Sequence, residues 1–167
     1  MLHVIAAWSI RPAPHATREY RARWRGITNM KHQVRIARPV SNLARSCEQY
    51  CHGLALRVVD SFEDHDGFDG VMLAFEDGDY HFEFTHCRDG RVAPRPTPED
   101  LIVLYIPDRS AWESRCRRMA RAGFTPVRSF NPYWDAHGRT YEDADGYRTV
   151  LHQSDGSSFT APRTPAR

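Results

Sequence analysis

The pattern of apolar and polar positions repeats once along the chain. Residues 33–40 alternate like a strand and lead into a polar cap and a helical pattern, and residues 101–106 begin the same series again. Each helical stretch is expected to end near a glycine followed by an apolar residue, Gly53-Leu54 and Gly123-Phe124. A repeated unit of this size buries its apolar faces poorly alone, so the repeat predicts two copies side by side in one domain, with a cavity between them.

Within each copy the periodicity predicts one strand, one helix and three further strands. The helices follow the capping residues Asn42 and Asp108. The tract Asn131-Pro132-Tyr133-Trp134-Asp135 predicts a fixed aromatic loop, because an Asn-Pro pair favours a turn. The remaining elements are strands at 54–59, 71–75, 80–85, 125–130, 139–142 and 147–152, a polar turn at 64–70 and a proline-rich linker at 88–100.

The 167 residues divide into a central domain and two flanking segments. The domain is predicted at 30–153, with module one at about 31–87 and module two at about 100–153. Residues 154–167 are rich in serine and proline and predict a disordered tail. Residues 1–29 form a basic segment, for which a flexible extension, a targeting arm and an upstream start codon before Met30 all remain open.

The charge distribution limits the possible partners. Residues 1–29 hold five arginines and one acidic residue, a net charge of +4, which leaves −2 for the rest of a chain whose total is +2. A mildly acidic domain is a poor partner for nucleic acid. The chain has no run of about 18 apolar residues, which predicts no membrane span. The arginines of the second helix, such as Arg115 and Arg118, are interpreted as a solvated helix face.

The four cysteines have no Cys-x-x-Cys spacing and are interpreted as reduced thiols of a cytoplasmic protein. Cys47 and Cys51 share one helix face, which suits small core residues better than a zinc site. The apolar opening of the chain lacks a positively charged leader and a cleavage site, so no secretory signal is expected. The sequence offers no glycine-rich phosphate loop and no Gly-x-Ser-x-Gly elbow.

Several short tracts resemble the vicinal oxygen chelate superfamily of glyoxalases, bleomycin-resistance proteins and extradiol dioxygenases. The tracts are Val40-Ser41-Asn42-Leu43, Phe82-Glu83-Phe84-Thr85, Ile106-Pro107-Asp108 and Glu142-Asp143-Ala144-Asp145-Gly146-Tyr147. The tracts at 65–73 and 130–135 are similar to those of its YycE-like branch. The resemblance implies an α+β fold in which two tandem βαβββ modules form a cup-like pair of four-stranded half-barrels, eight strands in all. It also implies helices on the outside and a possible homodimer.

The resemblance also implies where a metal would bind. Metal-using members hold a divalent ion through one ligand on each of four strands, and these positions fall on Arg35, Glu83, Leu101 and Val150. Only Glu83 can coordinate a cation, and a guanidinium would repel one. We therefore expect no metal and no other cofactor. A rearranged site that recruits His65, His81 or His86 beside Glu83 stays open.

Strand alternation places Arg35, His81 and Glu83 on one side of their strands, opposite the apolar core side. Arg35 and Glu83 are predicted to form an ion pair, which either fills the space of a lost ion or prepares a ligand site. A carboxylate or phosphate of a ligand that took Arg35 would release Glu83, which makes Glu83 the candidate catalytic base. His81 is then either a ligand-binding residue or a structural hydrogen-bond partner.

The other candidate ligand-binding residues are His65, Tyr105, Asn131, Tyr133 and Trp134. His65 lies in an aspartate-rich turn, as a proton shuttle or as an ordinary surface histidine. Tyr105 is expected beside Leu101, Val103, Val150 and His152 on one sheet face. Tyr133 and Trp134 suit the covering of a planar or amphipathic ligand, or else pack in the core, and Asn131 fixes their loop.

Three functions remain open. The leading hypothesis is a glyoxalase/bleomycin-resistance-like protein with a degraded metal site, which binds a small amphipathic or anionic molecule. The alternative is a metal-dependent lyase, isomerase or dioxygenase that uses Glu83 with nearby histidines. The third is an interaction module whose basic arm, Arg11 to Arg25, meets an acidic partner.

Overall fold

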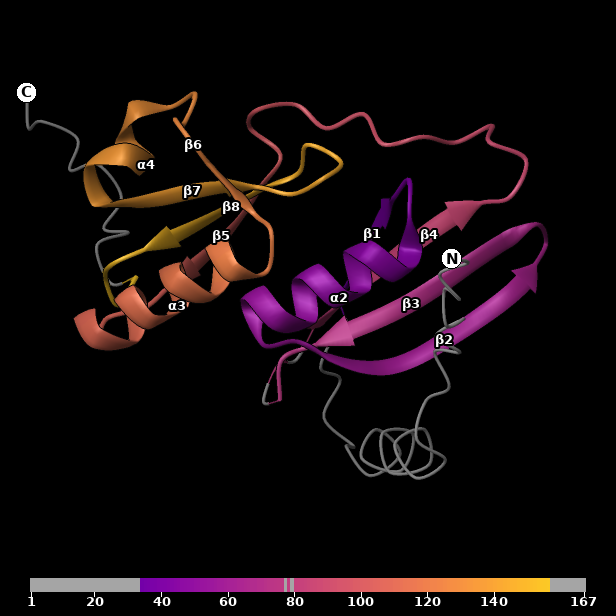
Figure 1. Cartoon of the computed structure of the whole chain (residues 1–167), viewed down its shortest axis with the longest axis horizontal. Coiled ribbons are helices and arrows are strands. Elements are labelled where there is room, and N and C mark those ends of the chain that lie inside the picture. Colours follow the sequence, from indigo (N-terminus) through magenta and orange to yellow (C-terminus); the bar gives the residue numbers. More distant parts are fainter. Residues whose placement is uncertain (1–33, 77, 79, 157–167) are drawn as a thin grey trace, which may run out of the picture. The chain divides into compact units, whose positions relative to one another are not determined.

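The computed structural model describes residues 34–76, 78 and 80–156, in two compact units. The predictions for residues 1–29, and for all of the predicted tail at 154–167 except its first three residues, lie outside the described residues. Helices and strands alternate much as the repeat predicts (Figure 1). In chain order they are β1 (Val34–Pro39), α2 (Leu43–Leu54), β2 (Arg57–His65), β3 (Phe68–Ala74), β4 (Tyr80–Cys87), β5 (Leu101–Tyr105), α3 (Arg109–Arg121), β6 (Thr125–Val127), α4 (Pro132–His137), β7 (Gly138–Glu142) and β8 (Arg148–His152).

The first unit holds a four-stranded mixed sheet in the order β1-β4-β3-β2. The edge strand β1 runs parallel to β4, whereas β4, β3 and β2 are antiparallel neighbours. Alternate residues of β3 and β4 point to one face and form its core, and they are Val71, Leu73, Phe82 and Phe84, each at most 1% exposed. The opposite face carries Arg35, His81 and Glu83, as the alternation of polar and apolar positions predicts.

The hairpin between β2 and β3 is tighter than predicted. The predicted strand at 54–59 is wrong at its start, because Leu54 still belongs to α2 and β2 runs from Arg57 to His65. The predicted turn at 64–70 shrinks to Asp66-Gly67, since β3 already begins at Phe68. Asp64 and Asp66 adopt positive φ angles of 48° and 52°, a conformation that aspartate tolerates better than most residues. Aspartates that suggest a loop therefore form a sharp reversal.

Helix α2 ends near Gly53, as predicted. It runs to Leu54, and the residue that leaves the helix with a positive φ of 61° is Ala55. Asn42 caps the helix start as predicted, because its Oδ1 accepts a hydrogen bond from the Arg45 backbone N at 2.9 Å. Gly53 allows α2 to approach the Phe124 ring closely, since a Cβ at this position would lie 2.7 Å from the ring.

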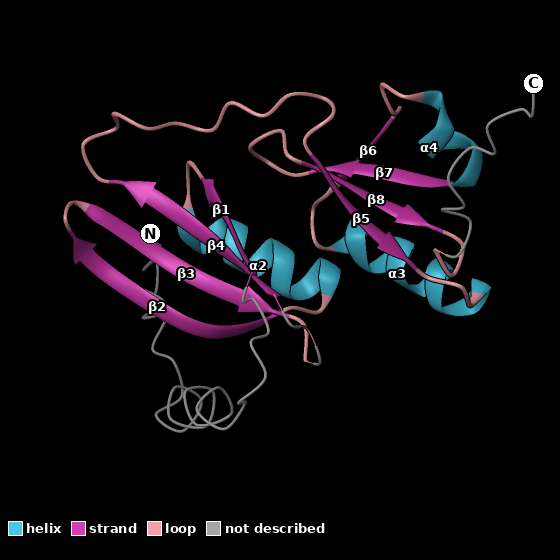
Figure 2. Ribbon diagram, turned by 180° about the vertical axis from the view of Figure 1, so that it is seen from behind, coloured by secondary structure: helices cyan, strands magenta, loops and turns pink. Residues whose placement is uncertain are grey.

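The second unit holds a mixed sheet in the order β5-β8-β7-β6, and α3 packs against one of its faces (Figure 2). The Trp112 indole donates to the Leu151 carbonyl at 2.8 Å, which ties α3 to β8. Asp108 caps α3 as predicted, with its Oδ1 accepting from the Ala111 N at 2.7 Å. Gly123, at a φ of 84°, closes the helix and turns the chain toward Phe124.

The predicted aromatic loop at 131–135 is a short helix instead. Asn131 is the N-cap of α4, with its Oδ1 accepting from the Tyr133 N at 3.0 Å, and Pro132 occupies the first turn. The Asn-Pro pair therefore starts a helix rather than a turn, because proline has no N–H to lose at that position. α4 packs against β7 and β8.

The second half of α2, Glu48–Ala55, belongs to the second unit. Its Tyr50 packs edge-on against Phe124, with ring centroids 5.2 Å apart, and donates to Asp143 at 2.8 Å. The arginines of α3 are not only a solvated face, because Arg115 donates to the Leu54 carbonyl and Arg118 to the His52 carbonyl. These contacts satisfy carbonyls that a helix end leaves without partners.

The fold is thus α+β, with two four-stranded mixed sheets of which neither closes into a barrel within the described residues. The strand–helix–three-strand order of each half is confirmed, with α4 as an additional helix in the second. All four cysteines are free thiols, and three of them are buried. No helix in the described part of the chain has the length and apolar content needed to cross a membrane.

Candidate functional site

The first cluster of chemistry-bearing residues lies on β1 and β4 in the first unit. Because the strands are parallel, Arg35 is paired with His81, and the next pair on this face is Ala37 with Glu83. The Arg35 Nε donates to the His81 Nε2 at 2.9 Å, and its Nη1 lies 2.6 Å from the Glu83 Oε2. The predicted ion pair is therefore present. Its geometry is that of a charge contact rather than an aligned hydrogen bond, because Glu83 Oε2 has no hydrogen-bond partner among the described residues.

Burial differs sharply within this cluster. His81 is 2% exposed and the Glu83 side chain 11%, whereas the Arg35 side chain is 50% exposed. The Glu83 carboxylate and the His81 imidazole thus contact the Nη1 and Nε atoms of Arg35, whose side chain is half exposed to solvent. Its Nη2 has no partner in the part of the chain that the structure describes, so it can donate to a ligand.

Burial and the neighbouring charges together set the protonation state of His81. Burial lowers the pKa of His81 below its usual value, the Arg35 charge lowers it further, and the Glu83 charge partly opposes both. A neutral ring at neutral pH agrees with the hydrogen bond, in which the His81 Nε2 accepts from Arg35. His81 is therefore an acceptor that orients Arg35 rather than a second cation.

The second cluster lies in the second unit, where β5, β8 and α4 meet. Tyr105 on β5 pairs with His152 on β8, and their rings are 5.1 Å apart. Tyr133 of α4 stacks on His152 at 5.8 Å with an interplanar angle of 26°, and Trp134 contacts it edge-on at 6.0 Å. His137 completes an aromatic enclosure around His152, 5.6 Å from its ring. Tyr133 is 43% exposed, so the enclosure reaches the surface.

His152 is the central residue of this cluster, although it is not among the candidate ligand-binding residues predicted from the sequence. It is 4% exposed, and burial lowers its pKa, with the nearby His137 adding to the effect. Its Nδ1 bonds the Ser154 hydroxyl at 2.9 Å, but its Nε2 has no partner among the described residues, and neither has the Trp134 indole nitrogen. Period-two alternation places His152 on the Tyr105 face, but the α4 residues that surround it cannot be foreseen from a pattern interpreted as a loop.

The remaining candidate residues have separate places. His65 ends β2 with its side chain 79% exposed, on the edge strand opposite to β1, so the sheet does not bring it to Arg35. Asn131 acts as the cap of α4, through its side-chain oxygen. Tyr105, Tyr133 and Trp134 do lie together, around His152.

The residues at the family's metal positions do not fit a divalent ion. Leu101 and Val150 offer no ligand atom, and Arg35 brings a positive charge to the one carboxylate, Glu83. Within residues 34–76, 78 and 80–156 no group of three or more His, Cys, Asp or Glu side chains is placed to hold a metal ion. No step of the function proposed below goes through a metal.

Comparison with known proteins decides the family. Residues 34–85 match the YycE-like N-terminal domain, and residues 99–153 match the YycE-like C-terminal domain. The uncharacterized protein YycE of Bacillus subtilis is 40% identical over 126 residues, which cover 75% of this chain and 91% of that protein. The chain belongs to the YycE-like family. The resemblance to this branch, given by the tracts at 65–73 and 130–135, is thereby confirmed.

Solved structures show the same fold for this YycE-like chain. A crystal structure of the B. subtilis YycE protein, of unknown function and described as a glyoxalase/fosfomycin resistance protein, matches with a TM-score of 0.70, 40% identity and coverage of 76% of this chain and 93% of that one. The trypanothione-dependent glyoxalase I of Leishmania major matches at 0.58 and 16% identity, covering 74% and 87%. The fosfomycin resistance protein FosX of Mesorhizobium loti matches at 0.57 and 15% identity, covering 79% and 95%. At such low identity the last two show only that the YycE-like fold is that of the vicinal oxygen chelate superfamily.

Proposed function

We propose that this protein binds a small anionic or amphipathic molecule and that Arg35 orients its anionic group. The observation that carries the proposal is the position of Arg35: two buried partners, His81 and Glu83, contact its guanidinium, while the side chain as a whole is 50% exposed. The Nη2 of a guanidinium held in this way can donate to a carboxylate or a phosphate group in a charge-assisted hydrogen bond. The residues beside it lie on β1 and β4, two paired strands of one sheet, which suits a pre-formed site.

The role of Glu83 follows from the same geometry. The Glu83 carboxylate is engaged by the Arg35 guanidinium, with its Oε2 2.6 Å from Nη1. An anionic ligand that draws Arg35 away would free Glu83 beside the bound molecule, where it could accept a proton. Ligand binding is therefore the primary function of the cluster, and any proton transfer by Glu83 would depend on it.

The likeness in fold agrees with this proposal. Proteins with this fold include one described as an antibiotic-binding protein from Streptomyces, which matches at a TM-score of 0.53 and 18% identity. That description belongs to that protein, and it supports the binding of small molecules as one use of the fold. The test therefore has to separate binding from metal-dependent chemistry.

A thermal-shift screen tests the proposal with pairs of carboxylates and phosphonates and their neutral amide or ester counterparts. A ligand at about 100 times its dissociation constant stabilises the native state by about 2.7 kcal/mol, which raises the melting temperature of a protein of this size by roughly 5–10 °C. We expect anionic members to give this shift and Arg35→Gln to abolish it. Arg57→Gln is the matched control, because Arg57 forms an exposed ion pair with Glu76 on the same sheet.

Two results would count against the proposal. If Arg35→Gln lowers the melting temperature but leaves the ligand-induced shift intact, Arg35 has a structural role only. If the purified protein instead carries a stoichiometric metal that Glu83→Gln removes, the metal-dependent alternative is correct.

A further inference from the structure

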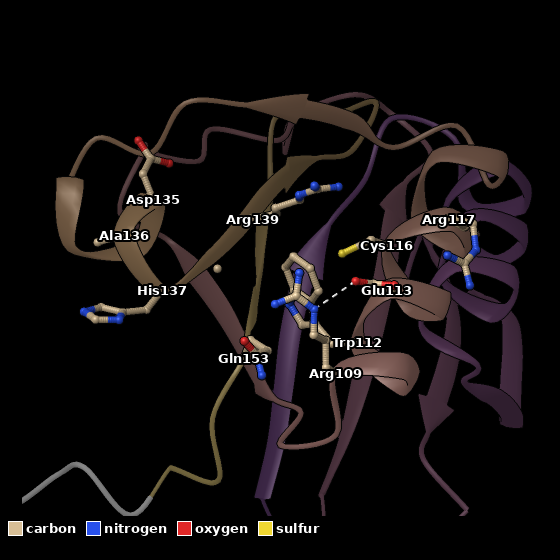
Figure 3. Close-up of a pocket in the computed structure, with 11 residues that line it drawn as sticks. Arg109, Trp112, Glu113, Cys116, Arg117, Asp135, Ala136, His137, Arg139 and Gln153 are labelled. Carbon is tan, nitrogen blue, oxygen red and sulfur yellow. Dashed lines mark hydrogen bonds and ion pairs between the residues drawn. The ribbon is translucent and has the colours of Figure 1, made fainter.

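A cavity of about 540 Å³ lies in the second unit, between α3 and the point where α4 leads directly into β7. This volume is in the usual range for pockets that bind small molecules. The side chains of Arg139, Trp112, Cys116 and Arg109 converge on the same space, whereas Asp135 and His137 point away from it (Figure 3). None of these four residues belongs to the clusters described above.

Arg139 is pre-oriented in this cavity. Its guanidinium lies over the Trp112 ring, 5.2 Å from the ring centroid, and it has no carboxylate at ion-pair distance among the residues that the structure describes. The Trp112 ring is itself fixed, because its indole N–H donates to the Leu151 carbonyl. A guanidinium over an aromatic ring keeps N–H groups along its edge and a second face that another planar group can contact.

The charge inside the cavity is positive. Of the two acidic residues that line it, Glu113 already pairs with Arg109, whose Nε lies 3.1 Å from its Oε1. Asp135 is engaged by the Ser129 backbone N–H at 3.0 Å, which lowers the pKa of its carboxyl, and its side chain points away (Figure 3). Arg139 therefore contributes a charge that no acidic residue offsets. Trp112, Cys116 and Ala136 add apolar surface.

We infer that this cavity is a second binding site, for a planar aromatic carboxylate. The carboxylate would bind the edge of the Arg139 guanidinium, with Arg109 at a second position, and the flat ring would stack on the outer face of the guanidinium. The site is independent of Arg35 and of the function proposed above. Its residues come from α3, α4, β7 and Gln153, the residue that follows β8.

Isothermal titration of the full-length protein with naphthalene-2-carboxylate tests this site. We expect one-to-one binding that weakens with rising salt, and about tenfold or more weaker binding in Arg139→Gln, since a hydrogen-bonded charge pair of this kind contributes at least that factor. The neutral probe naphthalene-2-carboxamide should bind about tenfold or more weaker than the acid. Arg121→Gln, on α3 but outside the cavity, is the matched control and should bind like the wild type.

A second pair of variants keeps the test decisive if Arg139→Gln does not fold. Arg109 and Glu113 have side chains 77% and 44% exposed, so their replacement leaves the core intact. Arg109→Gln should weaken binding, whereas Glu113→Gln should strengthen it because it removes a negative charge and releases Arg109. Equal affinity of the amide, equal affinity in Arg109→Gln and Glu113→Gln, or no binding at millimolar probe would overturn the assignment. Loss of binding in Arg35→Gln, with Arg109→Gln unaffected, would place the probe on the first unit instead and overturn it as well.

Discussion

At the scale of single residues, the chemistry of the first unit depends on three side chains in contact, those of Arg35, His81 and Glu83. Arg35 contacts a neutral imidazole through Nε and a carboxylate through Nη1. The two partners are buried and the Arg35 side chain is half-exposed, so the positive charge of the cluster lies on its solvent side. Removal of either charged partner must change the pKa of His81, because both charges act on it.

The first prediction uses the opposite signs of these two effects. Arg35→Gln removes a repelling cation and should raise the pKa of His81, whereas Glu83→Gln removes an attracting anion and should lower it. Burial, the largest cause, persists in both variants, so the pKa should stay below its usual value of 6.5 in Glu83→Gln. An NMR titration of the His81 ring measures both. A shift in the same direction in the two variants would show that the three side chains do not form one cluster.

The second prediction concerns stability in acid. His152 has a lowered pKa in the folded chain, so the unfolded chain binds its proton first as the pH falls. Its contribution to stability is complete above about pH 6.5 and declines below it until the folded pKa is passed, at up to about 1.4 kcal/mol per pH unit. His81 contributes a loss of the same sign.

Chemical denaturation at a series of pH values checks this prediction. His152→Phe keeps an aromatic ring in the enclosure and should flatten part of the decline below pH 6.5. His137→Gln should keep most of it, because burial, the larger cause of the lowered pKa, remains. An unchanged pH profile in His152→Phe would mean that His152 is accessible to protons in the native state.

At the scale of elements, α2 shows why a propensity rule can fail. A glycine inside a helix is replaced by alanine with a gain of up to about 1 kcal/mol when the position has space. At Gly53 a Cβ would lie 2.7 Å from the Phe124 ring and 3.1 Å from the Met119 sulfur, both in the core. The close packing of α2 against Phe124 and Met119 therefore depends on the absence of a side chain at Gly53.

The third prediction is that Gly53→Ala destabilises the protein, by about 1–2 kcal/mol in the free energy of unfolding, because overpacking outweighs the propensity gain. Phe124→Leu makes space at the same point and serves as the paired background. In that background Gly53→Ala should be neutral or stabilising, so the two changes couple in a double-mutant cycle. Additive effects in denaturant titrations would show that Phe124 is not the residue that excludes the Cβ.

The elements also show which part of the fold the sequence predicts. Alternation in β1 and β4 predicts the faces of Arg35, His81 and Glu83, because a period of two admits only two arrangements. The helix caps Asn42 and Asp108 are also confirmed, because capping depends only on residues within the first turn of the helix. The helix α4 is missed because Asn-Pro is compatible with a turn and with a helix start, and the choice depends on packing against β7 and β8. The cavity beside α4 is missed with it.

At the scale of the whole molecule, the two compact units are not two consecutive halves of the chain. Helix α2 begins in the first unit, and its residues from Glu48 on belong to the second. Tyr50, fully buried, contacts Phe124 and Asp143, which lie more than 70 residues further along the chain. Sequence periodicity treats α2 as the helix of the first copy, because long-range contacts leave no periodic pattern.

Asp143 is the residue through which Tyr50 acts on the second sheet. Its Oδ1 accepts from the backbone N–H groups of Asp145 and Tyr147, which shapes the turn between β7 and β8, and its Oδ2 accepts from the Tyr50 hydroxyl. Burial raises the pKa of Asp143 above its usual value, while the Tyr50 hydrogen bond opposes this. Asp143 therefore favours folding most in its protonated form, and this contribution is lost as the pH rises through its folded pKa.

The last prediction follows from that sign. Tyr50→Phe leaves the Asp143 Oδ2 buried without its hydrogen bond and should cost about 1–3 kcal/mol of unfolding free energy at pH 7. The cost should shrink near pH 4, where protonation of Asp143 removes the buried charge. Hydrogen exchange of the Asp145 and Tyr147 amides should quicken, although both lie in the second copy of the repeat. Tyr141→Phe is the control, because its hydroxyl donates to the Cys116 carbonyl at 3.4 Å and touches no carboxylate, so its smaller cost should not vary over this pH range. A cost of Tyr50→Phe that is the same at both pH values, with unchanged exchange at the turn, would show that the second unit does not depend on this helix for its β7–β8 turn.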